Sequence, residues 1–84
     1  MKSTLKILFA DDDLKYSLVL KRFLEREGYE VTYTGNGTMA LEQFPVVKPD
    51  LVLLDINMPG LNGFEVAEKI REQDRRSEEH TSEL

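Results

Sequence analysis

The sequence predicts an α/β fold: a doubly wound parallel sheet built from three strands that alternate with three helices. Two observations predict it: short apolar runs alternate along the chain with stretches of helical periodicity, and glycines and prolines stand between them. This order gives a parallel sheet with right-handed crossovers and helices on both faces. The 84 residues suffice for one small domain, near the size at which a single core becomes marginal.

Three short strands are predicted. Leu5–Ala10 and Leu51–Leu54 are apolar runs of the kind that parallel strands show when both of their faces are buried. Glu30–Thr34 is rich in β-branched and aromatic residues, and the segment Gly35-Asn36-Gly37 follows it. This segment lacks the glycine spacing and the lysine of a phosphate-binding loop, so it is interpreted as a turn.

The first predicted helix runs from Leu14 to Glu27. Its apolar residues follow helical spacing, and Gly28 stands where a glycine commonly ends a helix. The periodicity predicts that one apolar stripe faces the sheet, formed by Tyr16, Val19, Leu20, Phe23 and Leu24.

Two further helices follow the second and third strands. A short one is predicted from about Thr38 to Phe44, and Pro45 and Pro49 are expected to break the chain after it. The other is predicted from Gly63 to about Gln73, after a loop that begins at Pro59. Its apolar stripe consists of Phe64, Val66, Ala67 and Ile70.

The composition is that of an ordinary globular chain, with 40% hydrophobic residues, 32% charged residues and a formal net charge of −5. Nucleic-acid backbones are bound by clustered lysines and arginines, so no direct nucleic-acid binding by this segment is expected. No cysteine is present, and a metal would therefore need oxygen ligands. The apolar run after Met1–Thr4 is too short for a signal peptide or a membrane span, which favours a cytoplasmic protein without membrane contact.

Aspartates follow two of the predicted strands. Asp11, Asp12 and Asp13 come directly after the first strand, and Asp55 follows the third. Ligands of open parallel sheets bind at the carboxyl ends of the strands, so these carboxylates converge if the two strands are neighbours. Close carboxylates repel one another, and a divalent cation such as Mg²⁺ relieves the repulsion. A simpler role stays open, because an aspartate after a strand also serves as a helix N-cap, as expected for Asp13.

Two stretches resemble the receiver domain of two-component response regulators. The first is ILFADDD, followed by an amphipathic helix that ends in Gly28-Tyr29. The second is PDLVLLDINMPGLNG, which fits the family pattern D-x-x-M-P-x-x-x-G at Asp55, Met58, Pro59 and Gly63. The resemblance covers Lys6 to about Asp74. It implies a partial flavodoxin-like (CheY-like) fold, a (βα)3 fragment with strand order 2-1-3.

The resemblance also implies a site. Asp55 corresponds to the phosphoacceptor, which takes a phosphoryl group from a sensor histidine kinase or a phosphotransfer protein. Asp12 would bind Mg²⁺ directly, Asp11 largely through water, and the backbone carbonyl of Asn57 would complete the protein ligands. Such a domain is a switch and not an enzyme, and at most assists its own phosphorylation and dephosphorylation.

The end of the chain departs from the family. Receiver domains have two further strands, one ending in Thr or Ser and one in Lys. Thr81 lies near the expected separation from Asp55, but the residues directly before it, RSEEH, contain no apolar strand, so it is not interpreted as the switch hydroxyl, and His80 is interpreted as a solvated tail residue. We therefore expect impaired phosphotransfer. Residues 1–75 are interpreted as the N-terminal portion of a receiver domain. Residues 76–84, RSEEHTSEL, are interpreted as a non-native or disordered tail, because they resemble a translated sequencing adapter; a charged extension of the last helix is the alternative.

Two other functions stay open. One is a haloacid-dehalogenase-type phosphotransferase with Asp11 as nucleophile and Asp13 as acid/base, although Lys15 stands where that family has Thr or Val. The other is a receiver-like binding module that is never phosphorylated.

The third strand is expected to form an edge of the sheet. An apolar edge without charge or proline invites pairing. The isolated chain is therefore expected to be partly unfolded or to associate, most simply as a two-fold homodimer through this edge.

Overall fold

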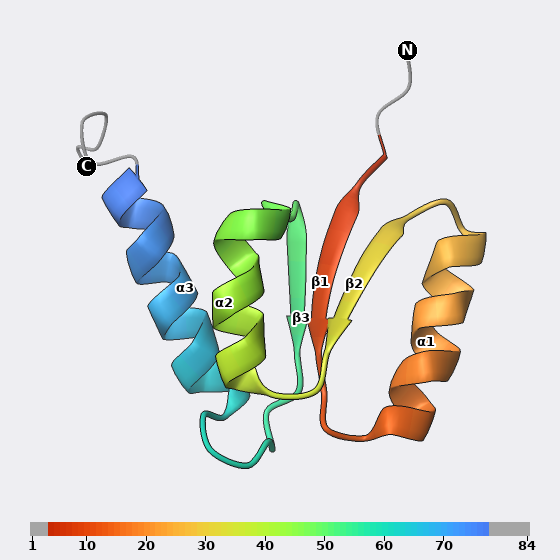
Figure 1. The fold of residues 1–84 in the computed structure, drawn as a ribbon, viewed down its shortest axis with the longest axis horizontal. Helices are drawn as coiled ribbons and strands as arrows, with labels where there is room; N and C mark the ends of the chain where they lie inside the picture. The colour runs from red at the N-terminus through yellow and green to blue at the C-terminus, as the bar shows by residue number, and fades with distance from the viewer. Residues whose placement is uncertain (1–3, 78–84) are drawn as a thin grey trace.

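The computed structural model describes residues 4–77, which form a three-stranded parallel sheet with helices on both faces (Figure 1). Helix α1 covers one face, and α2 and α3 cover the other. The order along the chain confirms the predicted alternation: β1 (Lys6–Ala10), α1 (Leu14–Arg26), β2 (Glu30–Thr34), α2 (Gly37–Val47), β3 (Leu51–Leu54) and α3 (Gly63–Ser77). None of the helices in this part of the chain is long and apolar enough to cross a membrane.

Strand β1 lies in the centre of the sheet, and the strand order β2-β1-β3 is the predicted one. Its last residue, Ala10, pairs with Thr34 at the end of β2 and with Leu54 at the end of β3. The carboxyl ends of all three strands are therefore level, at the lower edge of the view in Figure 1. This alignment brings the residues that follow β1 and β3 to the same place.

Alternate residues of β1 face two separate cores, as the pleat of a strand requires. Leu8 and Ala10 belong to the core under α2 and α3, together with Ala40 and Val66. Ile7 and Phe9 face α1, where Val31 joins them. The burial of β1 on both of its faces confirms the prediction for the first strand.

Side chains cap the two helices that begin near the carboxyl ends of the strands. The Asp13 carboxylate accepts a hydrogen bond of 3.2 Å from the Tyr16 amide, which confirms its predicted N-cap role. Gly28, with φ of 101°, follows α1 in the left-handed conformation that glycine adopts readily. Asn36 of the predicted turn caps α2 through a 2.8 Å bond from the Met39 amide.

Helix α2 is longer than the sequence predicted, and Pro45 lies inside it. The proline removes one backbone donor. The helix nevertheless continues beyond it to Val47, while Leu41 and Phe44 before the proline pack against the core under α2 and α3. It ends at Val47, and the amide of the next residue, Lys48, donates to the Phe44 carbonyl. Helix α3 also exceeds its prediction and runs to Ser77, in line with the helix-forming Glu, Gln and Arg residues of its second half.

Burial corrects the predicted apolar stripes of α1 and α3. In the stripe of α1, Tyr16, Val19 and Phe23 are exposed, and Ser17 is buried in their place. The reason is that α1 meets the sheet chiefly at β2, so only a narrow part of the helix is covered. In α3, Phe64 is exposed while Val66 is fully buried.

Strand β3 is not buried on both faces. Leu51 is 49% exposed and the other three residues of the strand are partly buried, because β3 is an edge of the sheet. The edge position itself was predicted. Leu5 lies outside β1 and is exposed.

Gly37 is the point where the start of α2 meets α3, and we predict that Gly37→Ala destabilises the fold. A Cβ atom there would lie 2.5 Å from the Val66 Cγ2 atom and 2.9 Å from the Leu61 carbonyl oxygen. The better helix propensity of alanine opposes this effect. Displacing backbone and a fully buried side chain costs more, and we expect a net loss of about 1–3 kcal/mol in the free energy of unfolding.

Urea unfolding followed by circular dichroism measures this loss. Gly35→Ala is the matched control, because its Cβ would meet only the Tyr33 hydroxyl, at 3.9 Å. Equal unfolding midpoints for the two variants would contradict the prediction.

Candidate functional site

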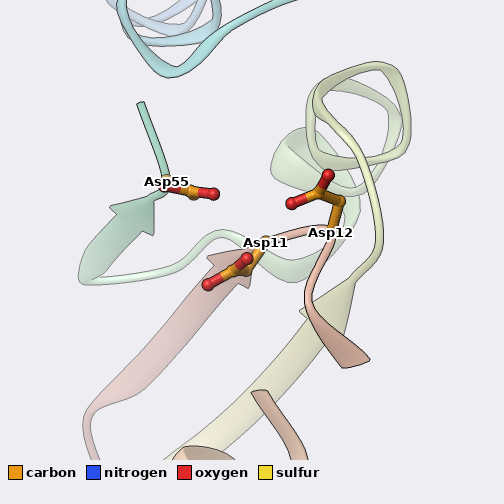
Figure 2. Close-up of side chains that lie close together, drawn as sticks. All are labelled: Asp11, Asp12 and Asp55. Carbon is orange, nitrogen blue, oxygen red and sulfur yellow. The ribbon is translucent and has the colours of Figure 1, made fainter. Parts of the chain in front are cut away.

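Three carboxyl groups gather at the carboxyl ends of β1 and β3. Asp11, Asp12 and Asp55 each place one oxygen so that these atoms lie within 4.8 Å of one another. Figure 2 shows the side chains of Asp12 and Asp55 pointing toward each other, with Asp11 below them in the view. The convergence predicted from the sequence is confirmed for these three aspartates. Asp13 is not part of the cluster, because its carboxylate caps α1.

The turn between β1 and α1 is held by hydrogen bonds to Asp11. Its amide donates to the Thr34 carbonyl at 3.2 Å, and its carbonyl accepts from the Tyr33 hydroxyl at 2.7 Å. Its carboxylate accepts from the Asp13 amide at 2.9 Å. Asp11 is therefore fixed and buried, with 6% of its surface exposed, whereas Asp12 is exposed.

The loop between β3 and α3 positions Asp55. Its amide donates to the Ala10 carbonyl at 3.0 Å, which extends the pairing of β1 and β3 by one residue. One carboxylate oxygen, Oδ1, accepts from the Asn57 amide at 3.4 Å. Asn57 itself is exposed beside the cluster.

Gly63 closes this loop. Its amide donates to the Ile56 carbonyl at 3.1 Å, and a Cβ atom would lie only 2.5 Å from the Asp55 carbonyl oxygen. Only a residue without a side chain permits α3 to begin this close to Asp55. Met58, another residue of the sequence pattern, is buried under α2 and α3 and anchors the middle of the loop.

The cluster perturbs Asp11. Burial raises the pKa of its carboxyl group above the ordinary value of 3.8, the hydrogen bond from the Asp13 amide opposes this, and the neighbouring Asp55 and Asp12 raise the pKa further. Oxygen ligands of high negative charge are what Mg²⁺ prefers. The donor set therefore fits a divalent cation that would relieve the repulsion.

Sequence reasoning missed Tyr33, which contacts the site through the Asp11 carbonyl. The signal was weak, because an aromatic residue in a strand is ordinarily a core residue. Thr81 and His80, considered from the sequence, lie outside the described residues, as does most of the proposed tail.

Comparison with known sequences places these features in a family. Residues 7–80 match the family described as the response regulator receiver domain. The chain is 41% identical over 68 residues to the alkaline phosphatase synthesis transcriptional regulatory protein PhoP of Bacillus subtilis, covering 81% of this chain and 28% of PhoP. It is 44% identical over 69 residues to the sensor protein EvgS of Escherichia coli, covering 82% of this chain and 6% of EvgS. The chain thus spans less than a third of these relatives.

Solved structures show the same fold. The response regulator protein TrrA of Thermotoga maritima, crystallised in complex with Mg²⁺ and BeF, matches with a TM-score of 0.81 and 43% identity over 86% of this chain and 63% of TrrA. The chemotaxis protein CheY4 of Vibrio cholerae matches with a TM-score of 0.84 and 29% identity over 89% of this chain and 62% of CheY4. The predicted flavodoxin-like, CheY-like class is confirmed.

We predict that Asp11→Asn stabilises the metal-free chain at neutral pH. Because the pKa of Asp11 is raised on folding, the folded state binds more protons than the unfolded state above pH 3.8. The contribution of Asp11 to stability therefore falls as the pH rises through this window. Asparagine can still accept the Asp13 amide without carrying the charge, and we expect a gain of roughly 1 kcal/mol.

The measurement is urea unfolding in EDTA at pH 7 and near pH 4, where the difference between the variant and the unaltered chain should shrink. Glu42→Gln, which removes an exposed carboxylate on α2, is the control and should show no such gain. A variant no more stable than the unaltered chain at pH 7 would contradict the electrostatic argument.

Proposed function

Because the chain belongs to the response regulator receiver domain family, we propose that it is a phosphoacceptor switch of two-component signalling that accepts a phosphoryl group on Asp55. Receiver domains act as signalling switches and are not generally classed as enzymes. The observation that carries the proposal is the position of Asp55 at the end of β3, with a carboxylate oxygen within 4.8 Å of oxygens of Asp11 and Asp12. The phosphoryl donor would be the phosphohistidine of a sensor histidine kinase or a phosphotransfer protein, and the location cytoplasmic.

The proposed metal centre uses oxygen atoms only. Asp12 and Asp55 would bind Mg²⁺ through their carboxylates, Asn57 through its backbone carbonyl, and Asp11 through water. A bound Mg²⁺ supplies neutralisation of charge on the transferring oxygens. The buried Asp11 supports this division of roles, since one of its carboxylate oxygens is already occupied by the Asp13 amide.

In the proposed transfer, a carboxylate oxygen of Asp55 forms a new bond to phosphorus. The bond between phosphorus and the donor imidazole breaks, and the imidazole nitrogen leaves with its electron pair. The Asn57 amide holds Oδ1, which leaves the second oxygen of the carboxylate for attack. The product adds charge and acceptor oxygens at the start of the loop before α3.

The dehalogenase-type alternative is not favoured by the geometry. Asp11 would be its nucleophile, but this residue is 6% exposed and bound on three sides. Asp13, its acid/base, caps α1. The other alternative, a binding module with the same site, differs from the proposal only in never accepting a phosphoryl group. Labelling of the chain with a small phosphodonor distinguishes the two.

We predict that radiolabelled acetyl phosphate with Mg²⁺ modifies Asp55. Asp55→Asn should abolish the labelling, and Asp12→Ala should slow it by about an order of magnitude, because a direct metal ligand is lost. Mass spectrometry after chemical trapping identifies the modified residue. Label on Asp11 would establish the dehalogenase-type mechanism, and no label on a folded chain that binds Mg²⁺ would contradict the phosphoacceptor proposal.

We further propose that the outer edge of β3, which no strand among residues 4–77 pairs with, pairs with the same edge of a second copy and gives one continuous sheet across a two-fold axis. Leu51–Leu54 contains no charge or proline that would oppose pairing, and Leu51 is half exposed. The second copy supplies backbone partners to the edge and covers apolar side chains.

We predict that size-exclusion chromatography of the unaltered chain at high concentration gives a dimer, with helical content confirmed by circular dichroism. Leu51→Lys should shift the chain to the monomer, because a charge at a half-exposed edge position opposes pairing. A cooperatively melting monomer of the unaltered chain at high concentration would disprove the dimer and leave the phosphoacceptor proposal untouched.

A further inference from the structure

The end of β2 holds both backbone polar groups of Asp11. The Thr34 carbonyl accepts its amide at 3.2 Å, and the Tyr33 hydroxyl donates to its carbonyl at 2.7 Å. The first bond continues the ladder of β1 and β2. The second is made by a side chain, and it fixes the peptide unit that leads directly to Asp12.

The hydroxyl of Tyr33 is itself held in place. Its ring packs against Phe9 with a centroid separation of 5.7 Å and an interplanar angle of 50°. Phe9 is 4% exposed and belongs to the core under α1, so the ring has a fixed support. The phenol therefore reaches from a packed core to the turn that carries two of the three clustered aspartates.

The turn needs such a support because its carboxylates repel one another. Asp12 is exposed, and none of the hydrogen bonds found among residues 4–77 holds its side chain. Its direction thus depends on the backbone of the turn. Among residues 4–77, the bond from Tyr33 is the one hydrogen bond that a side chain of another strand makes to that backbone.

We infer that Tyr33 is a positioning residue for the divalent-cation site: its hydroxyl fixes the turn after β1 so that Asp11 and Asp12 face Asp55 in the close arrangement that a small cation requires. This inference rests on the proposed function, which supplies the cation. Tyr33 touches neither the cation nor the phosphoryl group, and acts through the Asp11 carbonyl.

A purely structural hydrogen bond makes a different prediction. If Tyr33 only stabilised the fold, its loss would lower the folded fraction and weaken the apparent binding of every cation by the same factor. A positioning role changes selectivity. Mg²⁺ demands near-ideal octahedral geometry with short bonds, whereas Ca²⁺ accepts longer bonds and irregular geometry. A loosened turn therefore disfavours Mg²⁺ more than Ca²⁺.

The test is calorimetric titration of Tyr33→Phe with each cation. The substitution keeps the ring against Phe9 and removes only the donor. We expect Mg²⁺ affinity to fall about 10-fold and Ca²⁺ affinity by less than about 3-fold. The matched control is Tyr29→Phe, which removes a hydroxyl from the same core without touching Asp11 and should leave the ratio of the two affinities unchanged.

The outcomes separate the inference from the function on which it rests. Mg²⁺ binding that is the same in the unaltered chain, in Asp12→Ala and in Asp55→Asn would overturn the proposed site, and the role of Tyr33 with it. Site-specific Mg²⁺ binding with an unchanged ratio in Tyr33→Phe would overturn the role of Tyr33 alone.

A second measurement needs no variant. In nuclear magnetic resonance spectra of the unaltered chain, Mg²⁺ should shift the ring resonances of Tyr33 and not those of Tyr29. Tyr33 resonances that stay fixed while the Asp11 and Asp12 amides move would also overturn the inference.

Discussion

The pairing of β1 with a strand on each side is the constraint on which the site depends. Parallel register brings the ends of β1 and β3 level, and the bond from the Asp55 amide to the Ala10 carbonyl continues that register into the loop. On the other side, the bond from the Asp11 amide to the Thr34 carbonyl does the same. The carboxylates are close because the backbones that carry them are hydrogen-bonded neighbours.

This arrangement sets local stability against function. Three acidic side chains in a small volume repel one another, and the burial of Asp11 adds a desolvation cost to its charged form. The surrounding bonds to the turn offset part of that cost. A bound cation is stabilised by the same concentrated negative charge that destabilises the metal-free fold. Unfavourable charge interactions of this kind are typical of binding sites, where residues are suited to the ligand at some cost in the stability of the fold.

The sequence predicted the order of the elements and the convergence of the aspartates, because both depend on local patterns and on general rules for parallel sheets. It failed where packing decides. Pro45 lies inside α2 although a proline was expected to break the chain there, and Phe23 is exposed although it follows helical spacing. Tyr33 could not be assigned a role, because a strand residue shows its distant partner only once the register is known.

The bond between the Gly63 amide and the Ile56 carbonyl gives the loop after Asp55 a mechanical character of its own. This hydrogen bond joins the two ends of the loop, Ile56 and Gly63, so the loop is closed and the entropy cost of bringing its ends together has been met on folding. Residues within a ring can rearrange without pulling on the segments outside it. Asp55 lies immediately before this ring, so a change there reaches the ring through Ile56, and the residues on either side of the buried Met58 can adjust while the sheet keeps its register.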